Sequence, residues 1–251
     1  MLSSGSKGNS VYIESGEYRI LIDAGLSEKE LAARLLLIGR APGDLHGVFL
    51  THEHSDHIRG AGTLARKYKI PVFSTEGTYN EMKHAVGRIP DWHSFQQEDE
   101  IRVGDLCVEP YPTEHDAAES VAFVVRQGSL KLGHATDLGK VTPLVRERLS
   151  GASALLVESN HDIDMLHAGP YPWALKQRIK SDVGHLSNEA CAELLSFVNH
   201  DRLQFVVLMH LSETNNHPDI AQVTAAQALQ AGVATMILAR QDSPTQLLTI
   251  H

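Results

Sequence analysis

Short apolar runs alternate with amphipathic stretches along this chain, and the pattern predicts a mixed α/β fold. Residues 11–14 and 18–23 are apolar-rich runs on either side of a Gly-containing turn, which indicates a β-hairpin. After Ser27, apolar residues recur at helical spacing, and Glu30 completes a capping box with Ser27. Gly39 is expected to end this helix.

The remaining predicted elements follow the same alternation. Predicted strands cover 48–51, 71–74, 100–103, 106–111, 121–126, 130–135, 154–158, 203–209, 236–239 and 246–250. Predicted helices cover 61–68, 78–86, 144–149, 174–180, 188–198 and 220–231. Several strands are apolar on both faces, so their sheets should be covered on both sides. No repeat or linker interrupts the series, and we expect a single domain over residues 1–251.

Composition narrows the class of protein. The chain has 251 residues, of which 42% are hydrophobic and 21% are charged, as in soluble globular proteins. No apolar run approaches the roughly 20 residues of a membrane helix, and the first residues lack the apolar core of a signal peptide. We therefore expect no membrane partner. Cys107 and Cys191 lack a C-x-x-C spacing and are expected to be reduced core residues, which predicts a cytoplasmic location.

The densest chemistry lies in residues 51–57, directly after the apolar run 47–50. His52, His54 and His57 alternate there with two carboxylates. In an extended segment, residues 52, 54 and 56 would face one side and residue 57 the other. After a turn, His52 and His54 can hold one metal ion, and Asp56 with His57 a second. Imidazole with carboxylate suits Zn, Mn or Fe, and the absence of thiolate argues against a closed structural zinc site. The alternative is a histidine-rich surface loop without metal.

Three further candidate ligands each follow a predicted strand: His115, Asp137 and His210. Taken singly, each has a simpler interpretation. A histidine after a strand is commonly a hydrogen-bonded structural residue, and an aspartate before Leu-Gly is commonly a turn or N-cap residue. Together with the run at 51–57, they supply donors for two metal sites and an aspartate able to bridge them.

The run at 51–57, followed in order by these three residues, resembles the metallo-β-lactamase fold family over nearly the whole chain. The resemblance implies a four-layer αβ/βα sandwich with two divalent metal ions (Zn, Mn or Fe) at the sheet edges. It also implies a ligand set, in which the first metal is held by His52, His54 and His115, and the second by Asp56, His57 and His210, with Asp137 as the bridge. Asp56 is also expected to act in catalysis.

Asp23, at the end of the predicted hairpin, resembles the family's aspartate that supports a metal ligand from behind. The alternative is a simple turn residue. Segments 3–10, 158–162, 184–188 and 210–216 resemble more narrowly the YycJ/WalJ-like subgroup, whose members are regarded as 5′-to-3′ DNA exonucleases. That subgroup usually has a short strand before the loop at 3–8, whereas this sequence begins almost at the loop.

His185 is the candidate general acid. Residues 184–190 are similar to the motif that tRNase Z-type enzymes carry before their last metal ligand, whose histidine gives a proton to the leaving group. His185 also precedes a helix N-terminus that Ser187 or Asn188 can cap. The alternative is a histidine that only packs. Asn9 and His161 are expected to bind substrate, against the alternatives of a flexible turn and a hydrogen-bonded loop residue.

These features predict a two-metal hydrolase in which a metal-bridging hydroxide attacks phosphorus. We expect a nuclease resembling a 5′-to-3′ DNA exonuclease, with DNA favoured over RNA; the alternative is a small-molecule ester, thioester or lactone hydrolase. The net charge of −9 argues against a broadly basic nucleic-acid surface. Lys176, Arg178 and Lys180 alternate on a predicted helix, where a solvated helix is the default interpretation and phosphate contact the alternative. The sequence leaves the oligomeric state open.

Overall fold

A β-sheet forms in each of the two units into which the chain divides. The computed structural model describes residues 1–229 and 234–251. The first unit contains residues 1–112, 117–121 and 240–248, and the second contains 113–116, 122–239 and 249–251 within those limits. Each unit combines strands with helices, so the mixed α/β class is confirmed. The single domain over residues 1–251 stays a prediction.

The sheet of the first unit begins with the predicted hairpin. Its strand order is β1 (Val11–Ser15), β2 (Tyr18–Ile22), β3 (Gly47–Phe49), β4 (Val72–Ser74) and β5 (Trp92–Ser94). The β1–β2 pair is antiparallel, and the other pairs are parallel. The first unit also contains the antiparallel pair β6 (Ile101–Val103) and β7 (Leu106–Pro112). The short β5 was not predicted, because three residues carry no periodic signal.

The helices of the first unit are α1 (Glu28–Leu37), α2 (Ser55–Ile58), α3 (Ala61–Tyr68) and α4 (Glu76–Val86), with a 3₁₀ turn at Pro42–Asp44. The predicted capping box of α1 is confirmed: Ser27 Oγ accepts from Glu30 N, and Glu30 accepts from Ser27 N. Leu31 and Leu35 of α1 pack with Leu64 of α3 in one core cluster. This burial anchors the helices of the first unit in its core.

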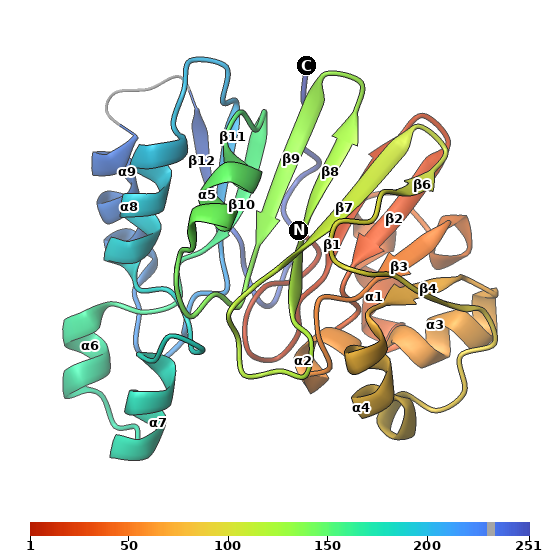
Figure 1. Cartoon of the computed structure of the whole chain (residues 1–251), viewed down its shortest axis with the longest axis horizontal. Helices are drawn as coiled ribbons and strands as arrows, with labels where there is room; N and C mark the ends of the chain where they lie inside the picture. Colours follow the sequence, from red (N-terminus) through yellow and green to blue (C-terminus); the bar gives the residue numbers. More distant parts are fainter. Residues whose placement is uncertain (230–233) are drawn as a thin grey trace. The chain divides into compact units, whose positions relative to one another are not determined.

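The second unit contains a sheet with the order β8 (Val121–Gln127), β9 (Leu130–Ala135), β10 (Ala154–Glu158), β11 (Phe205–Met209) and β12 (Thr235–Leu238). The β8–β9 pair is antiparallel, and β9, β10, β11 and β12 run parallel. Its helices are α5 (Pro143–Leu149), α6 (Ile163–Ala168), α7 (Trp173–Ile179), α8 (Asn188–Val198) and α9 (Pro218–Ala228). Figure 1 shows α5, α8 and α9 on one side of the β10–β12 strands.

Parallel pairing brings the ends of β9, β10 and β11 to one edge of this sheet. Ala135 pairs with Val157, and Glu158 pairs with Met209. The residues that follow these strands, Asp137 and His210, therefore emerge close to Glu158. No helix in the described part of the chain is long and apolar enough to cross a membrane.

One predicted strand is absent, and one predicted helix has different bounds. Residues 246–250 form no strand; at this end of the chain the Gln204 side chain bonds the His251 main chain in both directions, at 2.6 and 3.0 Å. Within the run 52–57 the chain turns, because Ser55–Ile58 closes a helical turn with His54 as its N-cap. The predicted helix at 220–231 is observed as Pro218–Ala228, and positions 230 and 231 lie outside the described residues.

Candidate metal centre

Asp23 organises the candidate ligands of the first unit. It follows β2, is 1% exposed, and its carboxylate accepts hydrogen bonds from Thr51 N and Thr51 Oγ1. Its Oδ2 lies 2.7 Å from His57 Nδ1. Because a buried carboxylate holds the proton on Nδ1, the lone pair of His57 is left on Nε2, the atom available to a metal. The structure thus places Asp23 where a supporting aspartate would act.

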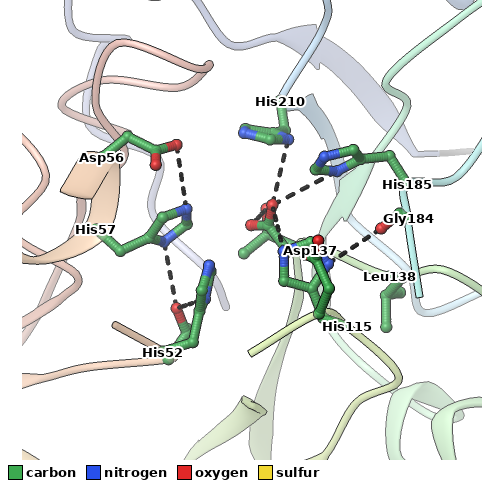
Figure 2. Close-up of polar contacts among 12 residues, drawn as sticks. His52, Asp56, His57, His115, Asp137, Leu138, Gly184, His185 and His210 are labelled. Atoms are coloured by element: carbon green, nitrogen blue, oxygen red, sulfur yellow. Dashed lines mark hydrogen bonds and ion pairs between the residues drawn. The ribbon is translucent and has the colours of Figure 1, made fainter. Parts of the chain in front are cut away.

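The imidazoles of the 52–57 run lie next to one another in the first unit. The ring centroid of His52 is 4.1 Å from that of His57 and 4.5 Å from that of His54. Thr51 Oγ1 lies 2.9 Å from His52 Nδ1. Asp56 Oδ2 is 3.5 Å from His57 Nε2, the contact drawn between these two residues in Figure 2. The helical turn at 55–58 produces this Asp56–His57 arrangement.

Asn9 lies against Asp56 and His57. It is 2% exposed, and its Nδ2 is 3.2 Å from Asp56 Oδ2 and 3.1 Å from His57 Nε2. Its Oδ1 accepts from Gly5 N at 2.8 Å. These contacts orient the side chains of Asp56 and His57, a role that the sequence pattern did not reveal. The expectation that Asn9 binds substrate stays a prediction.

The candidate ligands of the second unit gather around two carboxylates. Asp137 Oδ1 lies 3.8 Å from His115 Nε2, 3.5 Å from His185 Nδ1 and 3.7 Å from His210 Nδ1. His115 Nδ1 lies 3.1 Å from the Gly184 carbonyl oxygen, which fixes its ring from the other side. Figure 2 shows His115, Asp137, His185 and His210 of this group.

Glu158 is the functional residue that the sequence reasoning missed. Its Oε1 lies 2.8 Å from both His185 Nδ1 and His210 Nδ1. Its Oε2 accepts from Leu138 N at 2.8 Å and Leu186 N at 3.2 Å. The sequence did contain a sign of this role, because a glutamate ends an otherwise apolar strand. A carboxylate in that position is buried and therefore needs a partner.

The electrostatics favour a charged Glu158 and a protonated His185. Burial alone raises the pKa of Glu158, but the charge of His185 and the hydrogen bonds from His185 and His210 outweigh it and lower that pKa to about 2. Burial likewise disfavours the His185 imidazolium, yet the Glu158 and Asp137 carboxylates raise the pKa of His185 above its ordinary value. The raised pKa extends to higher pH the range in which His185 carries a proton.

His161 lies beside this group. It is 2% exposed, and burial lowers its pKa to about 4. Its buried Nδ1 has no hydrogen-bond partner among the described residues. The neighbouring Asn160 donates from Nδ2 to the His210 carbonyl oxygen at 2.9 Å. A neutral His161 ring whose Nδ1 is open to a hydrogen bond suits contact with a substrate. That His161 binds substrate stays a prediction.

Three of the candidate residues adopt left-handed backbone conformations. Asp23, Asp137 and His210 have φ values of 60°, 54° and 57°. A residue with a side chain pays roughly 1 kcal/mol or more for this conformation, and such costs persist where the surrounding structure holds a functional geometry. Each of these residues lies one or two positions after a strand. The left-handed φ therefore changes the direction of the chain, and of the side chain, where the strand ends.

Each unit supplies donor atoms of the kind that bind divalent metal ions. In the second unit, one ligand atom from each of Asp137, Glu158, His185 and His210 lies within 4.8 Å of the others. In the first unit, three imidazoles and Asp56 supply the donors. Both cysteines are buried outside any disulfide, and neither belongs to these groups of donors. Imidazole and carboxylate donors suit Zn, Mn or Fe.

Histidine and aspartate donors placed just after the strands of a mixed α/β fold define the class of metal-dependent hydrolases. The family model described as the Beta-lactamase superfamily domain matches residues 18–211. The chain belongs to this superfamily, so the predicted metallo-β-lactamase fold is confirmed.

Relatives and solved structures agree with this assignment. The chain is 41% identical to Exodeoxyribonuclease YycJ of Bacillus anthracis over 92% of this chain and 88% of that protein. It is 38% identical to Exodeoxyribonuclease WalJ of Streptococcus pneumoniae, over 91% of this chain and 87% of that protein. The metallo-β-lactamase fold protein YhfI of Bacillus subtilis superposes with a TM-score of 0.74 at 17% identity, covering 96% of this chain and 95% of YhfI, which shows likeness of fold alone. The predicted resemblance to the YycJ/WalJ-like subgroup is confirmed.

Asp23→Asn should weaken metal binding by about 10- to 100-fold, because the amide holds the His57 tautomer less firmly than the carboxylate does. Competition with a chromophoric chelator measures this affinity. The matched control is Asp91→Asn, which alters an exposed aspartate 2.9 Å from His93 Nε2. Equal metal affinity in Asp23→Asn and wild type would contradict a supporting role for Asp23.

Proposed function

We propose that this protein is a divalent-metal-dependent exonuclease that removes nucleotides from DNA in the 5′-to-3′ direction. The observation that carries the proposal is the His185–Glu158 pair, 2.8 Å apart, beside Asp137. An oxygen leaving from a phosphodiester needs a proton, and this pair can store one. The names of the two relatives, both exodeoxyribonucleases, support DNA as the substrate.

The proposed ligand assignment follows the family resemblance and the donor chemistry of each unit. The first metal is assigned to His52, His54 and His115, the second to Asp56, His57 and His210, and the bridge to Asp137. When bound, two divalent ions supply Lewis-acid stabilisation of phosphoryl oxygens and a water of lowered pKa. Zn, Mn and Fe all suit these donors.

The residues around the proposed metals have distinct tasks. Asp23 keeps the proton of His57 on Nδ1, and Glu158 does the same for His210. Glu158 also binds Nδ1 of His185, so that the proton available for transfer from the imidazolium is the one on Nε2. His185 gives this proton to the departing oxygen, and the buried Glu158 carboxylate stabilises the imidazolium beforehand.

The alternative function is hydrolysis of a small ester, thioester or lactone. The relatives' names do not favour it. The expected cytoplasmic location rests on two cysteines that form no disulfide, and it stays a prediction.

Linear duplex DNA labelled at either end tests the proposed function. With Mn²⁺, the purified protein should release a 5′ label as mononucleotide at once and a 3′ label only after a lag, because digestion starts at the 5′ end. Closed circular DNA, which has no end, should remain intact. Hydrolysis of a lactone or thioester panel without loss of DNA would instead support the alternative.

A further inference from the structure

The segment 165–181 of the second unit has an unusual charge pattern. The whole chain carries 31 acidic against 22 basic residues, yet these 17 residues contain three cations and no carboxylate. The cations are Lys176, Arg178 and Lys180. This segment thus presents local positive charge on an acidic protein, which is the electrostatic requirement for attracting phosphates.

Helix α7, within this segment, is not held by a buried face. None of its residues is buried, and Trp173, its first residue, is 67% exposed. The indole ring of Trp173 is therefore open to a ligand. Trp173, Lys176 and Lys180 are spaced at i, i+3 and i+7, so they share one face of the helix. Arg178 lies off this face and is paired with Asp116.

Two parts of the candidate metal centre of the second unit flank this segment in the sequence. Glu158 ends β10 before it, His185 follows it, and Asp164 and Asp182 border it directly. A β-bridge joins His161 to Ser187 where the two ends meet. Asp116 N donates to the Val183 carbonyl oxygen, next to His115. Figure 1 shows α6 and α7 beyond the end of α8, so the segment projects away from the helices that cover the sheet.

Charge also links α7 to the site. The positive charge of Lys180 affects the pKa of His161. Burial is the main cause of the lowered pKa; the charges of His185 and Lys180 lower it further, and the charge of Glu158 acts against them. Lys176 Nζ donates to the His167 carbonyl oxygen at 2.8 Å, which positions the ammonium group between α6 and α7. A strand bound along this face would carry its phosphates past these two lysines.

We propose that the Trp173–Lys176–Lys180 face of α7 binds a single-stranded segment of the nucleic-acid substrate. The identity of the substrate rests on the proposed function. Trp173 stacks on an unpaired base, and the two lysines lie near the neighbouring phosphates. A duplex fits less well, since its bases are already stacked on one another and expose only their edges to an indole ring. The site therefore holds the strand near the place where it is cut.

Binding of a 3′-fluorescent oligothymidylate, measured by anisotropy in EDTA so that the strand is not cut, tests this proposal. Trp173→Ala should weaken binding about tenfold, whereas Trp173→Phe, which keeps a stacking ring, should recover most of the loss. Lys180→Gln should reduce the slope of log Kd against log salt concentration by about 0.7. The matched controls are Phe197→Ala, 58% exposed on α8, and Lys29→Gln, exposed on α1; both should bind as wild type does.

The outcomes separate this proposal from the proposed function. If oligothymidylate binding depends on Trp173 but the protein cuts no DNA with Mn²⁺, the result supports the proposed binding face on α7 and rejects the proposed nuclease function. If the protein degrades DNA but Trp173→Ala and Lys180→Gln bind oligothymidylate as wild type does, the proposed binding face on α7 is wrong and the proposed nuclease function stands. Tighter binding of a blunt duplex, unaffected by Trp173→Ala, would also overturn the proposed binding face. Circular dichroism establishes that each variant is folded.

Discussion

Asp137→Ala should release divalent metal and slow DNA hydrolysis by about 10³-fold or more. Metal ions contribute several kcal/mol of transition-state stabilisation in such sites, and each 1.36 kcal/mol is a tenfold change in rate. Asp137 is 2% exposed, and its Oδ1 lies within 3.8 Å of ring nitrogens of His115, His185 and His210. Alanine leaves these imidazoles without their shared carboxylate. Metal content by mass spectrometry and initial rates on labelled DNA measure both effects.

The backbone at Asp137 requires a second variant. With φ at 54°, alanine is strained in a way that aspartate and asparagine tolerate better. Asp137→Asn keeps the shape and the backbone preference but removes the charge, so it should also lose metal while melting close to wild type. Asp201→Ala, at an exposed turn of the same unit, is the control for a lost carboxylate. Full nuclease activity in a metal-free Asp137→Ala protein would refute the two-metal scheme.

His185→Ala should lower kcat on DNA by about 10²- to 10⁴-fold while the bound metal is retained. The residue is assigned to proton transfer, so its loss should matter only where the leaving oxygen needs a proton. A nitrophenyl phosphodiester, whose leaving group departs as the anion, should be cleaved by the variant almost as fast as by wild type. The exposed His84→Ala serves as control. Equal losses on both substrates would argue against a general acid.

The pH profile gives an independent check on the same pair. Burial lowers the pKa of His185, but the Glu158 carboxylate raises it, and the raised pKa keeps the imidazolium present to higher pH. In Glu158→Gln, the negative charge is gone and the pKa of His185 falls. His185 then loses its proton at a lower pH. The fall in kcat on the basic side of the pH profile should therefore shift to lower pH. An unmoved basic limb would show that Glu158 does not set this pKa.

Local pattern was sufficient to predict most elements of this fold. The helix at Ala61–Tyr68 and the strand at Leu130–Ala135 have the predicted limits, because caps, turns and apolar periodicity act within a few residues. The short strand β5 and the helical turn α2 were missed, since three or four residues carry no period. The strand expected at 246–250 does not form: these residues join no ladder, and the Gln204 side chain bonds the main chain of the next residue, His251.

The sequence alone determined which donors the protein offers and where they stand relative to the strands: histidines and aspartates at 52–57, His115, Asp137 and His210. Donor chemistry and strand patterns are local properties, and they sufficed for the family. Only the tertiary structure decided how Glu158 serves His185 and His210, which lie 27 and 52 residues away in the sequence. Parallel pairing of β10 with β11 creates that contact. The same holds for the exposed face of α7, because solvent exposure depends on what the rest of the fold leaves uncovered.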